Sequence, residues 1–151
     1  MSQTSGDIHI IPPSGGEALN VFGGAMIQKS DGGDFPLFLA EHPIPPGYVV
    51  PPHVHERDDE AFYMLEGELT LLKPSGEVRV GPGTCVLLPR GSVHGFRNDT
   101  GSVVRFLILC NPGIQTAEMF RKFDRAGHAA SAGLSPAEIV GIAARYGVHM
   151  G

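Results

Sequence analysis

Residues 47–67 read GYVVPPHVHERDDEAFYMLEG and contain two histidines, His53 and His55, in an extended segment that follows two prolines. Because the side chains of a strand alternate between its two faces, both imidazoles project to the same side. Glu60 comes after a short polar loop and begins the next expected strand. Two imidazoles on one face can share a metal ion, and a nearby carboxylate can join them as a ligand.

A third histidine stands in a second block, residues 83–98, which read GTCVLLPRGSVHGFRN. His94 follows the turn Pro89-Arg90-Gly91, and strand pairing could bring it alongside the first two histidines. Three imidazoles and one carboxylate form a mixed ligand set suited to a divalent first-row metal. The other histidines are interpreted as ordinary surface or core residues: His9, His42, His128 and His149.

The two blocks resemble the two sequence motifs of the cupin superfamily, with ten fixed positions at matching offsets. These positions are Gly47, His53, His55, Glu60, Gly67, Gly83, Pro89, Gly91, His94 and Asn98. The resemblance implies an all-β, single-domain jelly-roll β-barrel. It also implies that His53, His55, Glu60 and His94 hold one divalent transition metal. Iron, manganese or nickel is favoured, and cobalt, zinc or copper is the alternative.

Composition agrees with a small β-rich domain. The chain has 151 residues, of which 21 are glycine and 13 proline, and 42% are hydrophobic. This length corresponds to one domain, and the hydrophobic content is too high for a disordered chain. Short apolar runs separated by turn clusters predict antiparallel strands. The expected strands lie at 18–30, 37–40, 61–65, 69–72, 78–80, 85–88 and 103–110.

The end of the chain changes to a helical period, so we divide it into an N-terminal segment (1–17), a β-barrel (18–112) and a helical extension (113–151). One apolar stripe consists of Met119, Phe120 and Phe123, and a second of Ile139, Ile142, Ala143 and Tyr146. Ser135-Pro136-Ala137-Glu138 predicts a capping box, and Gly147 a helix end. Packing on the outer wall of the barrel or on a partner subunit is favoured over a lid on the barrel mouth.

Charge and targeting signals narrow the partners. The net charge of −5 and the absence of basic runs argue against nucleic acid and anionic membranes. Residues 1–7 lack the features of a secretory signal, so a cytoplasmic protein is expected. Cys85 and Cys110 lie in apolar runs and are interpreted as buried free thiols. Cupins are commonly dimers, which makes a homodimer the expected assembly.

The resemblance extends to small cupins of the quercetin 2,3-dioxygenase-like type, which implies a dioxygenase acting on a small phenolic or enolic substrate. Glu60 would then be a ligand and a general base, or a ligand alone. Phe62 and Met64 share the parity of Glu60, and Phe96 that of His94, so these three are either substrate contacts or plain core. A non-oxidative isomerase, cyclase or lyase and a non-catalytic metal- or ligand-binding protein are the alternatives.

Overall fold

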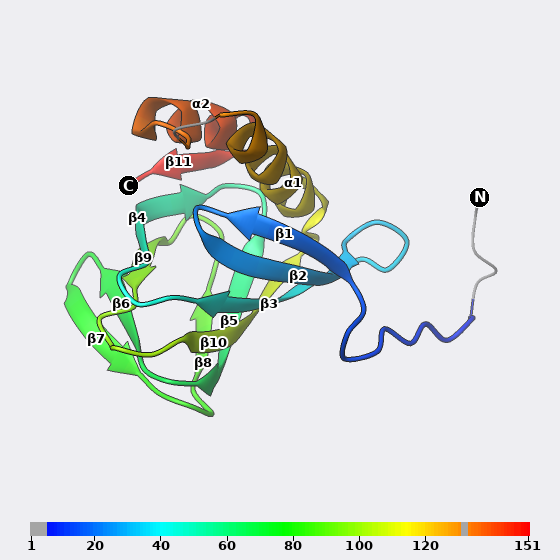
Figure 1. The fold of residues 1–151 in the computed structure, drawn as a ribbon, viewed down its shortest axis with the longest axis horizontal. Coiled ribbons are helices and arrows are strands. Elements are labelled where there is room, and N and C mark those ends of the chain that lie inside the picture. The colour runs from blue at the N-terminus through cyan, green and yellow to red at the C-terminus, as the bar shows by residue number, and fades with distance from the viewer. Residues whose placement is uncertain (1–5, 131–132) are drawn as a thin grey trace.

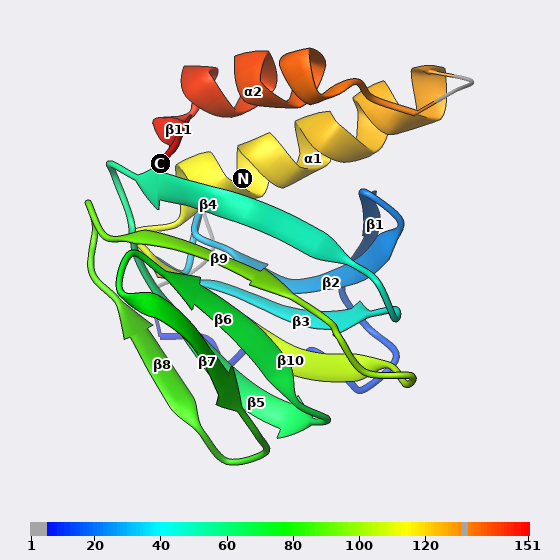
Figure 2. The ribbon, with the colours of Figure 1, turned by 90° about the vertical axis from the view of Figure 1, so that its left-hand side faces the viewer.

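The structure is a computed structural model that describes residues 6–130 and 133–151. Its strands form two antiparallel sheets that lie face to face (Figures 1 and 2). The six-stranded sheet contains, in spatial order, β1 (Glu17–Val21), β2 (Gly24–Asp31), β3 (Phe38–Ile44), β10 (Val104–Asn111), β5 (Asp59–Glu66) and β8 (Cys85–Leu88). The five-stranded sheet contains β11 (Val148–Met150), β4 (Val49–His55), β9 (Val93–Arg97), β6 (Leu69–Lys73) and β7 (Gly76–Val80).

The two sheets enclose the core without hydrogen bonding into one closed cylinder, and the arrangement is the expected jelly roll. Strand β3 illustrates the alternation, since every second side chain from Phe38 to Ile44 is buried. Phe62, Phe96 and Phe106 meet between the sheets with ring centroids 5.0 to 5.5 Å apart. Such tilted and edge-on contacts suit the quadrupoles of aromatic rings.

The N-terminal strand prediction needs a correction, because residues 18–30 form a hairpin and not a single strand. Val21 pairs with Gly24, so Phe22 and Gly23 form a two-residue turn between β1 and β2. Both turn residues have positive φ, 57° and 87°, as the tight turns of hairpins require. Phenylalanine does not favour such turns, so the residue type alone does not predict one at Phe22.

Three motif residues outside the ligand set, Gly67, Gly91 and Asn98, shape turns. Gly67 and Gly91 have φ of 79° and 86°, in the left-handed region that glycine adopts at low cost. Asn98 holds its turn through its side chain, which donates to the carbonyls of Ile44 and Ser102 and accepts from the Thr100 amide. These three motif residues are therefore structural.

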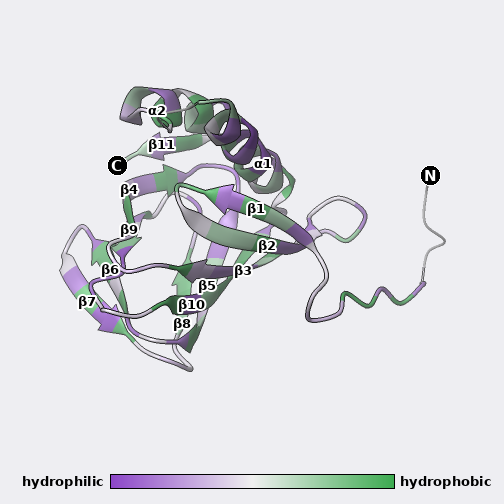
Figure 3. Cartoon of the chain, viewed as in Figure 1, coloured by the Kyte–Doolittle hydropathy of each residue, from purple (hydrophilic) through white to green (hydrophobic). Residues whose placement is uncertain are grey.

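Two helices follow the last long strand of the jelly roll, α1 (Ile114–Ala129) and α2 (Pro136–Arg145). The capping box at Ser135 is present, and Gly147 follows the end of α2 with φ of 77°. Figure 3 shows hydrophobic and hydrophilic residues mixed along both helices, as expected for helices with one packed face. Within the described ranges, no helix is long and apolar enough to cross a bilayer.

The sequence did not predict the short strand β11, which pairs with β4 directly beside the histidine doublet. Val148 lies opposite His55, and Met150 lies opposite His53. The C-terminus thereby returns to the edge of the five-stranded sheet (Figure 1). The predicted division at residues 17 and 112 stays a prediction, and residues 1–5 of the N-terminal segment lie outside the described residues.

One cysteine prediction is wrong. Cys110 is buried, as expected, but Cys85 is exposed. Cys85 shares the outward parity of Leu87 on β8, the edge strand of the six-stranded sheet, whereas Leu88 faces the core. A four-residue apolar run on an edge strand does not reveal which of its residues face inward.

Candidate metal centre

The four predicted ligands converge from three strands of the two sheets. His53 and His55 lie on β4, and His94 lies on β9 directly opposite His53. Glu60 reaches them from β5 in the facing sheet. One candidate ligand atom from each of the four side chains lies within 4.8 Å of all the others, and all four residues are buried.

Backbone carbonyls orient two of the three imidazoles. Nδ1 of His53 lies 2.9 Å from the carbonyl oxygen of Pro51, and Nδ1 of His94 lies 3.2 Å from that of Ser92. A carbonyl oxygen only accepts, so each Nδ1 carries the hydrogen and each Nε2 keeps its lone pair. A carbonyl that holds Nδ1 in this way fixes the ring and presents Nε2 to a metal.

The contact between His94 and Glu60 tests whether these residues fit a cation. Nε2 of His94 lies 2.9 Å from Oε1 of Glu60, and Nε2 of His55 lies 3.8 Å from the same oxygen. With Nδ1 of His94 donating to Ser92, Nε2 and Oε1 would face each other as two acceptors. A proton or a metal ion must neutralise them, and three nitrogens with one carboxylate oxygen fit a divalent metal.

The protonation states agree with this fit. Burial, together with the neighbouring imidazoles His94 and His55, lowers the pKa of His53 to about 4, so its imidazole is neutral at pH 7. Burial alone would raise the pKa of Glu60, but the surrounding imidazoles outweigh it and lower the pKa to about 2. At pH 7, Glu60 therefore offers a carboxylate and His53 a neutral nitrogen, the forms in which metals bind.

Cys110 is a neighbour of the ligands that the sequence interpretation missed. It pairs with Glu60 across β10 and β5, and its thiol donates to Oε2 of Glu60 over 3.5 Å. Burial raises the pKa of this thiol, and the carboxylates of Glu60 and Asp58 raise it further. Cys110 thus remains a thiol that holds one carboxylate oxygen while the other faces the histidines.

The loop before Glu60 is tied to the first helix. One carboxylate oxygen of Asp58 accepts from the backbone amide of Gly113 over 2.9 Å, and the other accepts from the hydroxyl of Thr116. Asp58 is buried, and its contacts lie at the start of α1. A carboxylate stabilises a helix N-terminus, so the same loop supports both the ligand and the helix.

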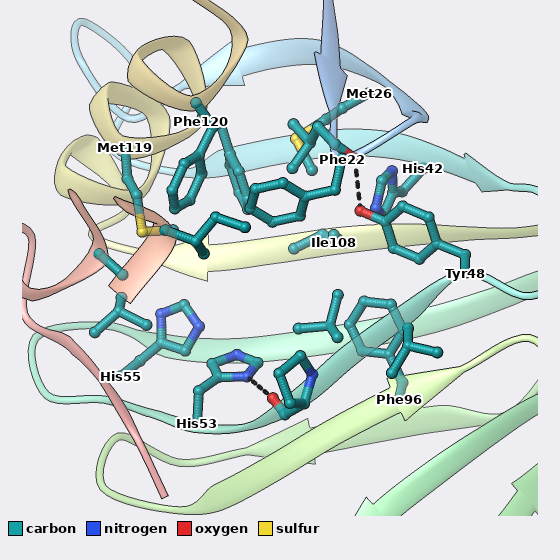
Figure 4. A pocket seen from close by; sticks show the side chains of 18 of the residues that line it. Phe22, Met26, His42, Tyr48, His53, His55, Phe96, Ile108, Met119 and Phe120 are labelled. Carbon is teal, nitrogen blue, oxygen red and sulfur yellow. Dashed lines mark hydrogen bonds between the residues drawn. The ribbon is translucent and has the colours of Figure 1, made fainter. Parts of the chain in front are cut away.

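A cavity of about 320 Å³ opens beside the ligands (Figure 4). His53, His55 and Glu60 line one end of it, and His42 and Tyr48 line the other. The space between these ends is bounded by apolar side chains, among them Phe22, Met26, Phe62, Phe96 and Ile108. No lysine or arginine stands among the described residues that line the cavity.

The predicted substrate contacts divide in two. Phe62 and Phe96 line the cavity, whereas Met64 is fully buried and does not line it. Met64 has the inward parity of Glu60 but pairs with Phe106, farther along β5, where the sheets pack directly together. Arg90 and Arg97 do not line the cavity, and they pair with Asp59 and with Glu77 and Asp99, respectively.

The helices close the cavity, as the lid alternative expected, so the prediction that their stripes pack on the outer wall is wrong, and packing on a partner subunit stays a prediction. Met119, Phe120 and Phe123 of α1 line the cavity. Residues of α2 and β11 complete the cover, and these are Pro136, Ile139, Val140, Ala143, Val148 and Met150. Figure 2 shows both helices along the side of the strands that carries β4.

Comparison with known families decides the fold family. Residues 41–110 match the sequence profile of the cupin domain, and solved cupins share the fold. The chain contains a cupin domain. The buried cluster of His53, His55, Glu60 and His94 fits the metal site of a cupin.

Three relatives carry different activities. Quercetin 2,3-dioxygenase from Bacillus subtilis (strain 168) is 34% identical over 73 residues, which cover 48% of this cupin and 21% of the relative. The crystal structure of the polyketide cyclase RemF from Streptomyces resistomycificus has a TM-score of 0.61 and 27% identity, covering 70% of this chain and 80% of RemF. A sugar phosphate isomerase of the cupin superfamily from Silicibacter pomeroyi has a TM-score of 0.55 and 29% identity, covering 59% of each chain.

The cupin spans about a fifth to two fifths of the length of the curated relatives that it matches. The shared part therefore identifies the cupin domain. The activity has to be argued from the cavity of this chain.

Proposed function

We propose that this cupin is a metal-dependent dioxygenase that acts on a small phenolic or enolic substrate. One observation carries the proposal: the apolar cavity opens directly onto Glu60, His53 and His55. Ligand sites are commonly apolar clefts with a few placed polar groups, and this cavity lies at the lower end of the usual range of ~300–1,000 Å³. The similarity to quercetin 2,3-dioxygenase supports the same substrate class.

The proposed cofactor is one divalent transition metal held by His53, His55, Glu60 and His94, with iron, manganese or nickel favoured. When bound, such a metal supplies Lewis acidity for an enolate or phenolate oxygen and redox chemistry for dioxygen. Four protein ligands leave coordination positions open on a six-coordinate ion, unlike a closed structural site.

Glu60 is the residue proposed to move the proton. It is ionised, lines the cavity and can accept the hydrogen of a substrate hydroxyl that enters beside it. Cys110 fixes Oε2 through its hydrogen bond, which keeps the carboxylate plane aimed between the histidines and the cavity.

The remaining residues bind the substrate and exclude water. Phe62 and Phe96 form apolar walls, and Phe120 and Phe123 cover the cavity from α1. Without a cationic side chain in the described lining, the cavity disfavours a phosphorylated substrate, because a desolvated phosphate needs paired positive charge.

A non-oxidative cyclisation is the second candidate, and the similarity to RemF over most of both chains favours it. The same ligands would then polarise an enolic substrate without oxygen. Oxygen uptake separates the two functions. Protein purified without an affinity tag, with its metal content measured, is mixed anaerobically with a flavonol or a diketone and then exposed to air.

Oxygen consumption in proportion to metal content supports the dioxygenase. Anaerobic product formation supports the cyclase instead. Binding without turnover under either condition would leave the third alternative, a protein that holds metal and ligand without catalysis.

We also propose that the protein is a homodimer that buries the outer face of the six-stranded sheet. This face exposes Tyr63, Leu65 and Leu87, with 43%, 37% and 74% of their surface accessible. Exposed apolar patches of this kind commonly mark protein interfaces. Sedimentation is expected to give a dimer, and Leu87→Glu a monomer with unchanged metal content; a monomeric parent protein contradicts the proposal.

A further inference from the structure

The cavity has polar side chains only at its two ends, among the described residues that line it. We name these the metal end, formed by His53, His55 and Glu60, and the His42 end, formed by His42 and Tyr48. Figure 4 shows the two ends on opposite sides of an apolar middle that contains Phe22 and Ile108. A molecule bound at the metal end would therefore reach the His42 end with its opposite edge.

The His42 ring is fixed in one orientation. Its Nδ1 lies 2.7 Å from the carbonyl oxygen of Ala25, so Nδ1 carries the hydrogen and Nε2 keeps a lone pair. The rings of Tyr48 and Phe106 hold it edge-on, with centroids 5.6 and 5.5 Å away. Rotation of the imidazole would break the hydrogen bond to Ala25.

Nε2 of His42 has no hydrogen-bond partner in the described part of the chain. Among the described residues, only Gln28 has side-chain nitrogen or oxygen atoms that are both fully enclosed and without a partner. Nε2 of His42 also lacks a partner, so it is not fully enclosed. Because His42 is 98% buried from solvent and lines the cavity, the open side of Nε2 is the cavity itself. Burial also lowers the pKa of His42 to about 4, which keeps the ring neutral and Nε2 an acceptor.

Tyr48 makes the His42 end selective for hydrogen-bond donors of a bound molecule. Its hydroxyl donates to the carbonyl oxygen of Val21 over 2.7 Å, so its hydrogen is committed and its oxygen can only accept. Both free polar atoms at this end are thus acceptors. A substrate hydroxyl can satisfy them, whereas a carbonyl, an ether or a carboxylate cannot.

We propose that His42 is a specificity-determining residue that accepts a hydrogen bond from a hydroxyl at the end of the substrate remote from the metal ligands. The inference rests on the proposed function, which places the enolic end of the substrate at Glu60. Strand register offsets the two ends: Cys110 pairs with Glu60 and Phe106 with His42, so the two residues lie four positions apart along the direction of β10, roughly 13 Å of backbone rise. The substrate class is accordingly a flat phenol of two or three rings with hydroxyls at both ends.

Ligand binding under anaerobic conditions tests this without turnover. The probes are 3-hydroxyflavone and its 4′-hydroxy and 4′-methoxy derivatives, titrated calorimetrically into the protein as purified. The unaltered protein is expected to bind the 4′-hydroxy compound about tenfold more tightly than 3-hydroxyflavone, the effect of one well-formed hydrogen bond, and to bind the 4′-methoxy compound least tightly.

Two variants assign the preference to His42. His42→Phe is expected to bind 3-hydroxyflavone within about twofold of the parent protein and to lose the preference for the 4′-hydroxyl. His42→Gln places an amide oxygen near the position of Nε2 and is expected to restore part of it. The comparison of the three probes on the unaltered protein needs no variant, so a folding defect of His42→Phe does not prevent the test.

The outcomes separate this inference from the proposed function. Binding of all three probes without a preference, or a preference that persists in His42→Phe, overturns the role of His42 and leaves the proposed function standing. Failure of every flavonol to bind overturns the proposed substrate class, and the role of His42 with it.

Discussion

The two ends of the cavity are held by different forces. At the metal end, His53, His55 and Glu60 cluster with His94 behind them, and the backbone carbonyls of Pro51 and Ser92 orient His53 and His94. At the His42 end, aromatic packing shapes the space, and each polar side chain makes one hydrogen bond to the main chain. Substitutions at the metal end should therefore change the chemistry, whereas those at the other end and in the cover should change binding.

The largest expected effect is the loss of metal from the double variant His53→Ala plus His94→Ala. Removing two of four ligands leaves a donor set too small to retain a divalent ion through purification. Metal analysis of untagged protein should fall from about one ion per chain to background. His149→Ala is the matched control, because His149 lies on β11 beside the ligands, pairs with Glu56 and stands outside the cluster. Stoichiometric metal in the double variant would contradict the proposed site.

Glu60→Gln should lower turnover per metal by about 10²- to 10⁴-fold, the usual contribution of general-base catalysis, while the fold is retained. The amide keeps the shape of the side chain but cannot take a proton at neutral pH. Rates are divided by measured metal content, so that weaker metal binding does not pass for a catalytic defect.

Cys110→Ala is a milder change at the same carboxylate than Glu60→Gln. It removes the hydrogen bond to Oε2 and leaves the carboxylate in place, so turnover per metal should fall by no more than about tenfold. Near-parental turnover in Glu60→Gln would limit Glu60 to the role of ligand.

The same contrast explains what the sequence could predict. His53 and His55 could be identified because the strand period alone puts them on one face, and Gly91, with a φ of 86°, lies in the turn expected before His94. Cys110 and His42 could not be identified from the sequence, because their positions near Glu60 and at the cavity depend on how β10 pairs with β5 and β3. The stripes of the two helices were visible, but the surface that they cover depends on how Asp58 anchors α1, a contact between residues 55 positions apart or more.

The pH dependence of stability should report on the His42 end. The pKa of His42 falls from the usual 6.5 to about 4 on folding, so the folded state binds fewer protons between these values. Its contribution to the free energy of unfolding is complete above about pH 6.5 and is lost as the pH falls toward 4. The full difference is about 3 kcal/mol.

Chemical denaturation at pH 7 and pH 4.5, with chelator present throughout, measures this contribution. In His42→Gln, the loss of stability between the two pH values should be smaller by about 2–3 kcal/mol, because the other titrating groups are unchanged. An equal loss of stability in both proteins would mean that His42 titrates normally in the fold.

The smallest effect is expected in the cover, where Phe120→Ala should raise the KM of an apolar substrate about tenfold and leave kcat and metal content nearly unchanged. Phe120 is half-buried, packs against Phe38 with ring centroids 5.7 Å apart and faces the cavity, so its removal costs about half the value of a fully buried aromatic side chain. Arg125→Ala, on the exposed side of the same helix, is the control and should leave KM unaltered. A lower kcat at constant KM would instead assign α1 to the chemical step, for example by excluding water. Unchanged constants in Phe120→Ala would mean that the substrate stays on the strand side of the cavity and does not contact the cover.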